Sequence, residues 1–197
     1  IFKLILAAIV LDKKLIKENY KVNCNGVYAF YDTKFHCWKE EGHGIVSLNQ
    51  AIQQSCNIYF YDLIQKMDLN LWSEEVKKFG FGSKTGIDLN AERIGLIPTV
   101  DYMNKTYKKS GGWSKGHMLN LSIGQGETSV TPIQINNLIN CIANGGYIYR
   151  PHINKTKVSK KLIVYNKDVL RKIKKYMFDA VNKNKGTAYN AAIDLSK

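Results

Sequence analysis

The stretch GHGIVSLNQAIQQSCNIYFY, residues Gly42–Tyr61, carries a Ser-x-Asn triplet formed by Ser55, Cys56 and Asn57. Apolar residues on both sides of the triplet keep a roughly helical spacing, which predicts an amphipathic helical run. A Ser, a Cys and an Asn in the middle of that pattern predict either a break between two helices or polar groups turned toward a cleft. Ser-x-Asn alone is common and is usually a cap or a turn. Its meaning therefore depends on the segments before and after it.

The segments before the triplet predict a helix followed by short strands. Residues 2–15 indicate a core helix, because residues 2–11 are all apolar except Lys3. Residues 20–38 alternate and are punctuated by Asn25-Gly26, which favours short strands or a hairpin. Ser47 is a plausible N-cap for the helical pair that contains the triplet.

The segments after the triplet predict more helices and few strands. Ser73 is expected to cap a short helix ending at Phe79, and residues 85–122 are expected to form a long ordered excursion with little regular structure. Thr131-Pro132 is typical of an N-cap followed by proline at the first helical position. The remaining expected elements are a helix over 132–143, strands over 147–151 and 161–165, and an amphipathic helix over 167–182.

The composition fits a packed globular protein. The chain has 197 residues, 45% of them hydrophobic and 11% aromatic, which excludes a disordered chain. The net charge is +13, but the lysines are spread along the chain rather than clustered, so no nucleic-acid partner is expected. The opening run IFKLILAAIVL is too short to span a bilayer.

Three landmarks occur in a characteristic order: a lysine near the start of a buried helix, Ser-x-Asn about fifty residues later, and then a Gly-Gln-Gly turn before a Thr-Pro helix start. Together they resemble the transpeptidase domain of class B penicillin-binding proteins, of the penicillin-binding protein 2 type that serves cell elongation. The resemblance covers nearly the whole chain. The stretches that carry the resemblance are IFKLILAAIVLD, FHCWKEEGHGIVSLNQAIQQSCNIYFY, FGFGSKTGIDL and LNLSIGQGETSVTPIQ.

The resemblance implies an α/β (α+β) fold of the β-lactamase/transpeptidase-like type. Residues 1–197 would be one partial transpeptidase domain, truncated at both ends, that holds mainly the helical part and an incomplete antiparallel sheet. A membrane anchor would lie upstream, which implies a protein of the bacterial inner membrane that faces the periplasm.

The resemblance also implies the site residues. The family's nucleophile belongs to Ser-x-x-Lys, and Ile1-Phe2-Lys3 matches its last three positions, so the serine is expected directly before Ile1. Lys3 would accept the proton of that serine, Ser55 would relay it to the leaving nitrogen, and Asn57 would hold the substrate's peptide group and help to orient Lys3.

The family's third motif, a Lys-Thr/Ser-Gly strand, is expected beyond Lys197. Two stretches imitate it, Lys84-Thr85-Gly86 and Lys185-Gly186-Thr187, and neither is assigned to it. The first follows Ser55 too closely, and the second has the wrong order. Without the serine and this strand, the chain as given is expected not to react with penicillin.

The implied activity is peptidoglycan D,D-transpeptidation through a serine acyl-enzyme, with no cofactor. The expected partners are stem peptides of the lipid-linked precursor, β-lactam antibiotics and a glycosyltransferase of the elongation machinery. Two alternatives stay open. One is a serine β-lactamase or β-lactam sensor on the same fold, and the other is a non-catalytic basic module that binds the wall or a polyanion.

The cysteines and histidines leave three interpretations open. Cys24, His36, Cys37 and His43 are weak metal-ligand candidates, because their spacing is not that of a standard zinc module. Cys24 and Cys37 could instead form a disulfide across a hairpin, or remain free thiols. Cys56 is expected to point into the core. His117 replaces the acidic residue usual in the family's Trp-x-x-Gly-Asp stretch, which puts a charge contact there in doubt.

Overall fold

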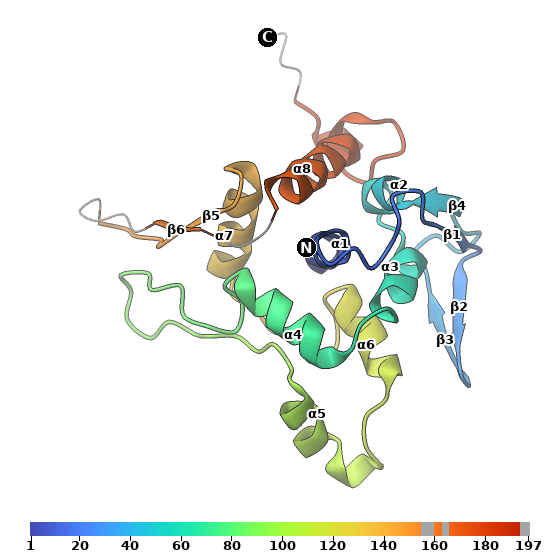
Figure 1. Cartoon of the computed structure of the whole chain (residues 1–197), viewed down its shortest axis with the longest axis horizontal. Helices are drawn as coiled ribbons and strands as arrows, with labels where there is room; N and C mark the ends of the chain where they lie inside the picture. Colours follow the sequence, from blue (N-terminus) through green and yellow to red (C-terminus); the bar gives the residue numbers. More distant parts are fainter. Residues whose placement is uncertain (155–159, 163–165, 194–197) are drawn as a thin grey trace.

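A single apolar helix lies at the centre of the molecule. The computed structural model describes residues 1–154, 160–162 and 166–193. Helix α1 (Phe2–Asp12) is contacted by α2 (Leu48–Gln53), α3 (Asn57–Ile64), α4 (Leu69–Lys78), α6 (Lys115–Ser122) and α8 (Lys167–Asn182). Figure 1 shows these helices arranged in a ring around α1. The sequence FKLILAAIVLD explains this position, because a helix that is apolar on all sides is stable only when it is buried on all sides.

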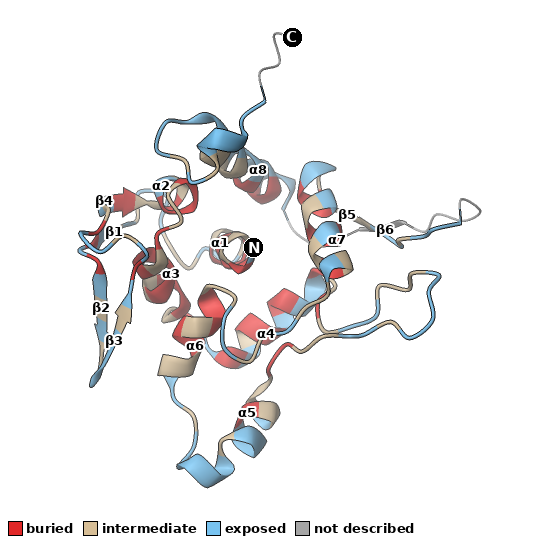
Figure 2. Ribbon diagram, turned by 180° about the vertical axis from the view of Figure 1, so that it is seen from behind, coloured by how far each residue is buried: buried red, intermediate tan, exposed pale blue. Residues whose placement is uncertain are grey.

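Helix α7 (Pro132–Ala143) lies between α4 and α8 in the view of Figure 1 and packs against α8. Helix α5 (Val100–Thr106) projects outward from the ring (Figure 1). Buried residues of the ring helices face α1, whereas the projecting loops and hairpins are mostly exposed (Figure 2). The part of the chain that the structure describes also has short 3₁₀ turns, η1 at Lys108–Ser110 and η2 at Tyr189–Ala191.

Within the described residues, the strands form three two-stranded antiparallel sheets. Strand β1 (Lys21–Cys24) pairs with β4 (Gly44–Ser47), so that Cys24 lies opposite Gly44. Strand β2 (Val27–Phe30) pairs with β3 (Thr33–His36) in a hairpin, and β5 (Tyr147–Tyr149) pairs with β6 (Lys160–Leu162). The first two sheets stand beside α3 and bring the ends of β1 and β3 close to the start of that helix.

The chain breaks between α2 and α3 at the triplet, as the sequence predicts. A capping box starts α2: Gln50 N–H donates to the Ser47 side chain, and Ser47 N–H donates to the Gln50 side chain at 2.9 Å. The helix ends at Gln53, and Ser55 then takes a left-handed conformation with φ +54°. Such a φ is unusual for a residue with a side chain, and it turns the chain sharply before α3 begins at Asn57.

Several boundaries agree with the sequence-based expectations. The helices over 132–143 and 167–182 begin and end as predicted, and Thr131 caps α7 with proline at its start. Residues 20–38 do form short strands. The strand expected over 147–151 ends at Tyr149, and of the one expected over 161–165 residues 163–165 lie outside the described residues.

Three expectations are wrong. The first helix ends at Asp12 rather than at residue 15, because Lys14 adopts a positive φ of 53°. Ser73 is not a cap but lies buried inside α4; the true N-cap is Asp68, whose carboxylate accepts a hydrogen bond from Leu71 N at 2.8 Å. Residues 85–122 hold α5, η1 and α6 rather than little regular structure.

The Gly-Gln-Gly turn is fitted against the start of α1. Gly124 has φ +81°, and a Cβ atom there would lie 2.8 Å from a ring carbon of Phe2, closer than carbon atoms approach. The Phe2 ring is held in turn by Trp72, with the ring centroids 6.2 Å apart, and by Phe81 at 5.6 Å. This turn therefore helps to fix the residue that directly precedes Lys3.

We expect Gly124→Ala to destabilise the protein through both the backbone and the contact with Phe2. A positive φ costs an alanine about 1–2 kcal/mol, and overpacking against the ring should add about 1–3 kcal/mol. The matched control is Gly145→Ala, which has the same φ of +81° but open space around the added Cβ. Urea unfolding followed by tryptophan fluorescence measures both; equal losses of stability would contradict the proposed fit to Phe2.

Candidate functional site

Lys3 is the centre of a hydrogen-bonded group that includes both polar residues of the triplet. Its ammonium donates to the Ser55 carbonyl oxygen at 2.7 Å, to Ser55 Oγ at 2.9 Å and to Asn57 Oδ1 at 2.6 Å. The three residues predicted as catalytic are thus brought together by the structure. Their side chains come from the first turn of α1, the α2–α3 break and the first residue of α3.

The backbone conformation explains how the residues on both sides of Cys56 can accept hydrogen bonds from one ammonium group. The left-handed Ser55 turns its carbonyl and its hydroxyl to the same side of the chain, toward Lys3. The amide of Asn57 is anchored on its other side, where Nδ2 donates to the His36 carbonyl oxygen at 3.3 Å. The amide oxygen is therefore oriented toward Lys3 by the hairpin strand β3.

The surroundings of Lys3 lower its pKa. Burial disfavours the charged ammonium and brings the pKa from 10.5 to about 8, while negative charge on the thiols of Cys56 and Cys37 would raise it. The Lys3 ammonium also lies 5.6 Å from the centre of the Phe60 ring. At pH 7 about a tenth of Lys3 is then a neutral amine, the form able to accept a proton, and this fraction rises with pH.

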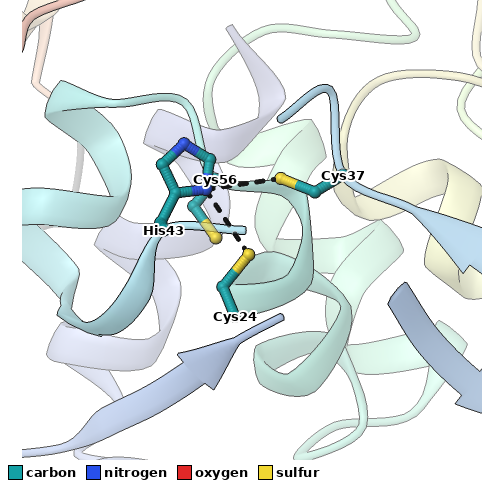
Figure 3. Close-up of side chains that lie close together, drawn as sticks. All are labelled: Cys24, Cys37, His43 and Cys56. Atoms are coloured by element: carbon teal, nitrogen blue, oxygen red, sulfur yellow. Dashed lines mark hydrogen bonds between the residues drawn. The ribbon is translucent and has the colours of Figure 1, made fainter. Parts of the chain in front are cut away.

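A second group of side chains includes Cys56, the middle residue of the triplet. Cys24, Cys37, His43 and Cys56 place their ligand atoms within 4.8 Å of one another (Figure 3). The three cysteines are at most 5% exposed. Cys24 ends β1, Cys37 follows β3, His43 precedes β4, and Cys56 is the N-cap of α3. We call these four residues the sulfur cluster.

The cluster is organised around the His43 ring. His43 Nδ1 lies 3.4 Å from Cys24 Sγ and 3.5 Å from Cys37 Sγ. A hydrogen bond from the Cys56 thiol, with backbone N–H groups of Lys39 and Asn57, holds the pKa of the Cys37 thiol well below its usual range, against the opposing effect of burial. The same bond and burial raise the pKa of Cys56.

Two nitrogen–sulfur distances in the cluster match those of a tetrahedral metal site. With zinc–sulfur bonds of about 2.3 Å and zinc–nitrogen bonds near 2.0 Å, the nitrogen–sulfur edges of a regular tetrahedron are about 3.5 Å. The two nitrogen–sulfur distances in the cluster are 3.4 and 3.5 Å. Three sulfurs and one imidazole nitrogen are a soft donor set of the kind that structural zinc sites use. Of the residues that the structure describes, only this group qualifies as a metal-binding cluster.

The sequence identified three of these four residues. His36 does not belong to the group; only its backbone takes part in the site, by accepting the bond from Asn57. The fourth member of the cluster is Cys56 instead. We expected Cys56 in the core, and it is fully buried, but its thiol faces the other sulfurs. The pairing Cys24↔Gly44 across the sheet is the signal that could have brought His43 and Cys24 together. All four cysteines are free thiols, so the Cys24–Cys37 disulfide is absent from this structure.

The two imitations of the third motif have other contacts. In Lys84-Thr85-Gly86, the Thr85 and Gly86 amides donate to the Glu92 carboxylate at 2.6 and 3.1 Å, and the Gly86 carbonyl accepts from Arg150. These bonds close a surface loop. In the second imitation, Thr187 N donates to the Gln53 carbonyl at 3.0 Å, at the end of α2.

His117 has a structural role at the start of α6. Its Nδ1 accepts a hydrogen bond from Ser114 N at 3.1 Å and so completes a capping box, and its ring packs edge-on against Tyr107. The imidazole therefore accepts the capping hydrogen bond that a carboxylate at this position would accept at a helix start.

Comparison with known families identifies the class of protein. Residues 1–196 match the model of the penicillin-binding protein transpeptidase domain. The chain belongs to this family, and its similarities indicate the class B, penicillin-binding protein 2 (MrdA) type, as the motifs predict. The predicted β-lactamase/transpeptidase-like fold is also confirmed.

Particular relatives support the same type. The chain is 32% identical over 175 residues to the peptidoglycan D,D-transpeptidase MrdA of Haemophilus influenzae, covering 83% of this chain and 27% of that protein. It is 41% identical over 120 residues to the Acinetobacter baumannii protein of the same name, covering 61% of this chain and 18% of that protein. The chain thus spans about a quarter or less of the length of these relatives.

Solved structures similar to this chain include proteins of the same type. The penicillin-binding protein PBP2 of Helicobacter pylori superposes with a TM-score of 0.88 at 30% identity, over 95% of this chain and 36% of that one. PBP2 of Pseudomonas aeruginosa, in complex with WCK 5153, gives 0.86 at 32% identity, over 95% of this chain and 45% of that one. Another structure holds the H. pylori protein together with MreC. Among the described residues, no helix has the length and apolar character needed to cross a membrane.

We expect the sulfur cluster to bind one zinc ion. Because three of its four donors are thiols, Cys24→Ser should weaken zinc binding by more than about 100-fold, a larger loss than the 10- to 100-fold typical of outer partners. The matched control is Cys141→Ser, since Cys141 is also fully buried but lies on α7, outside the cluster. Competition with a chromophoric chelator measures the affinity; equal zinc binding by both variants would contradict the site.

Proposed function

We propose that the whole protein is a peptidoglycan D,D-transpeptidase, and that this chain is the part of its transpeptidase domain that carries the general base. The observation that carries the proposal is the set of bonds from the Lys3 ammonium to Ser55 and Asn57. The family match and the names of the relatives support the same activity.

In the proposed mechanism, the neutral Lys3 amine accepts the proton of a serine hydroxyl placed one helical turn earlier, at the position before Ile1. The serine oxygen attacks the carbonyl carbon of the penultimate D-alanine of a stem peptide. The bond to the terminal D-alanine breaks, and Ser55, which is hydrogen-bonded to Lys3, passes the proton to the departing nitrogen. An amine of a second stem peptide then attacks the ester and releases the serine.

Asn57 has two tasks in this proposal. Its amide oxygen keeps the Lys3 ammonium in place at 2.6 Å, and its amide nitrogen is the group available to bind the substrate's peptide carbonyl once it leaves the His36 carbonyl oxygen. Binding of substrate would thus exchange a weak hydrogen bond of 3.3 Å for a new one.

We further propose that a metal ion in the sulfur cluster has a structural role. The triplet is held on one side by Lys3, and Cys56, its middle residue, would be held on the other side by the metal. Bound metal would supply no chemistry to the acyl transfer in this scheme, because its four protein donors would fill a tetrahedral site.

The substrate would be a stem peptide of the lipid-linked precursor, β-lactams would acylate the same serine, and the domain would work on the periplasmic side of the inner membrane. The structure of the H. pylori relative with MreC is compatible with work in a wall-synthesis complex, where a glycosyltransferase is the proposed partner. A serine β-lactamase is the alternative, and rapid hydrolysis of a chromogenic cephalosporin by the whole protein would favour it.

Lys3→Met should slow acylation of the whole protein by a fluorescent penicillin by about 100- to 10,000-fold, the usual contribution of a general base. Methionine keeps the length and the burial of the side chain but cannot accept a proton. Lys105→Met is the matched control, because Lys105 is an exposed lysine on α5, and it should label at the normal rate. Normal labelling of the Lys3 variant would exclude Lys3 as the base.

The rate of this acylation should rise with pH and level off above about 8. The lowered pKa of about 8 means that Lys3 changes from charged to neutral there, and only the neutral amine accepts a proton. Below that pH the rate should fall about tenfold per unit. Second-order rate constants measured between pH 6 and 9 test this, and a rate that does not change with pH would contradict it.

A further inference from the structure

The sulfur cluster brings three thiol groups within 4.8 Å of one another. Three of the four cysteines of the chain are gathered in it, all buried, and the fourth, Cys141, is alone on α7. Thiols this close to one another are the substrates for disulfide formation, whereas a metal that occupies them protects them.

We propose that the sulfur cluster is a thiol redox switch: when it holds no metal, Cys37 and Cys56 form a disulfide that moves Ser55 and Asn57 away from Lys3. This inference rests on the metal centre proposed above for its protected state. It differs from the disulfide that the sequence suggested, which joined Cys24 to Cys37.

The contacts within the cluster select the pair. The Cys37 sulfur accepts a hydrogen bond from Asn57 N–H at 3.4 Å, so it lies against the start of α3 beside Cys56, and the two sulfurs are within 4.8 Å of each other. Cys24 has its contact with the His43 ring, at 3.4 Å. A disulfide needs the sulfurs to close to about 2.05 Å, so a Cys37–Cys56 bond would give up the contact of Cys37 with the His43 ring and keep that of Cys24.

The reaction balances with hydrogen peroxide as the oxidant. The Cys37 thiolate attacks one peroxide oxygen, the oxygen–oxygen bond breaks, and protonation of the leaving hydroxide gives water and a sulfenic acid on Cys37. The Cys56 sulfur then attacks the Cys37 sulfur and displaces hydroxide, which takes the Cys56 proton and leaves as water. Two thiols are oxidised by two electrons, and one peroxide is reduced to two waters.

The disulfide would act on the catalytic group through the backbone. All three acceptors of the Lys3 ammonium belong to the two residues on either side of Cys56. The Asn57 N–H donates to the Cys37 sulfur at 3.4 Å, and this bond would weaken when that sulfur becomes part of a disulfide. Ser55 has little freedom to adjust without its positive φ changing. A displacement of Cys56 toward Cys37 is therefore passed on to both neighbours.

The test compares the whole protein with zinc and after zinc removal by a chelator, each treated with hydrogen peroxide. Peptide mapping should find Cys37 linked to Cys56 only in the zinc-free sample, and a reducing agent should reverse it. Cys24→Ser should still form this disulfide, whereas Cys56→Ser should form none and leave a Cys37 sulfenic acid that dimedone traps. Cys141 should stay a thiol throughout and serves as the internal control.

A second measurement reports on the triplet itself. Amide hydrogen exchange of the peptide that contains residues 55–60 should become faster in the oxidised protein, because the start of α3 loses its hydrogen bond to Cys37. Unchanged exchange in a fully oxidised sample would overturn the effect on the catalytic group.

The outcomes separate this inference from the metal centre. A protein that binds zinc but keeps all its thiols in peroxide after zinc removal overturns the switch and leaves the metal centre supported. A protein that binds no zinc but forms the Cys37–Cys56 disulfide overturns the metal centre and with it the protected state. A disulfide between Cys24 and Cys37 overturns the assignment of the pair.

Discussion

The site depends on one partly buried ammonium group, that of Lys3. Burying a charge is unfavourable unless polar atoms replace the lost water, and around Lys3 one short segment supplies all three replacements. The same burial that demands these acceptors also lowers the pKa of Lys3 toward neutrality. One constraint thus sets both the geometry of the triplet and the basicity of the amine, so the two properties cannot be changed independently.

The arrangement of the helices explains how that constraint is met. Helix α1 is enclosed by its neighbours and has no room to shift, and Phe2 is clamped between Trp72, Phe81 and the turn at Gly124. On the other side, two antiparallel sheets bring β1 and β3 against the start of α3. The lysine and its acceptors are therefore each attached to a rigid element, which limits the loss of entropy when they meet.

Much of the fold and the main site residues could be predicted from the sequence, because the signals there are local or belong to a family pattern. Thr131-Pro132 predicted the start of α7, and the motif order singled out Lys3, Ser55 and Asn57, which the structure brings into one hydrogen-bonded group. The start of α4 was missed because Ser73 has the residue type of a cap but is buried by tertiary packing. Cys56 was missed as a member of the sulfur cluster because its partners come from three other segments, and no spacing within one segment reveals such a contact.

The enclosure of α1 also has a consequence for how the chain folds. The helix appears at the start of the sequence, but one of its neighbours, α8, begins only at Lys167. At synthesis rates of about 5–20 residues per second, the delay between the two is on the order of ten seconds. During that time an almost wholly apolar segment lacks part of its native cover. Protection from aggregation during biogenesis is therefore a requirement that this architecture places on the cell, separate from any requirement of catalysis.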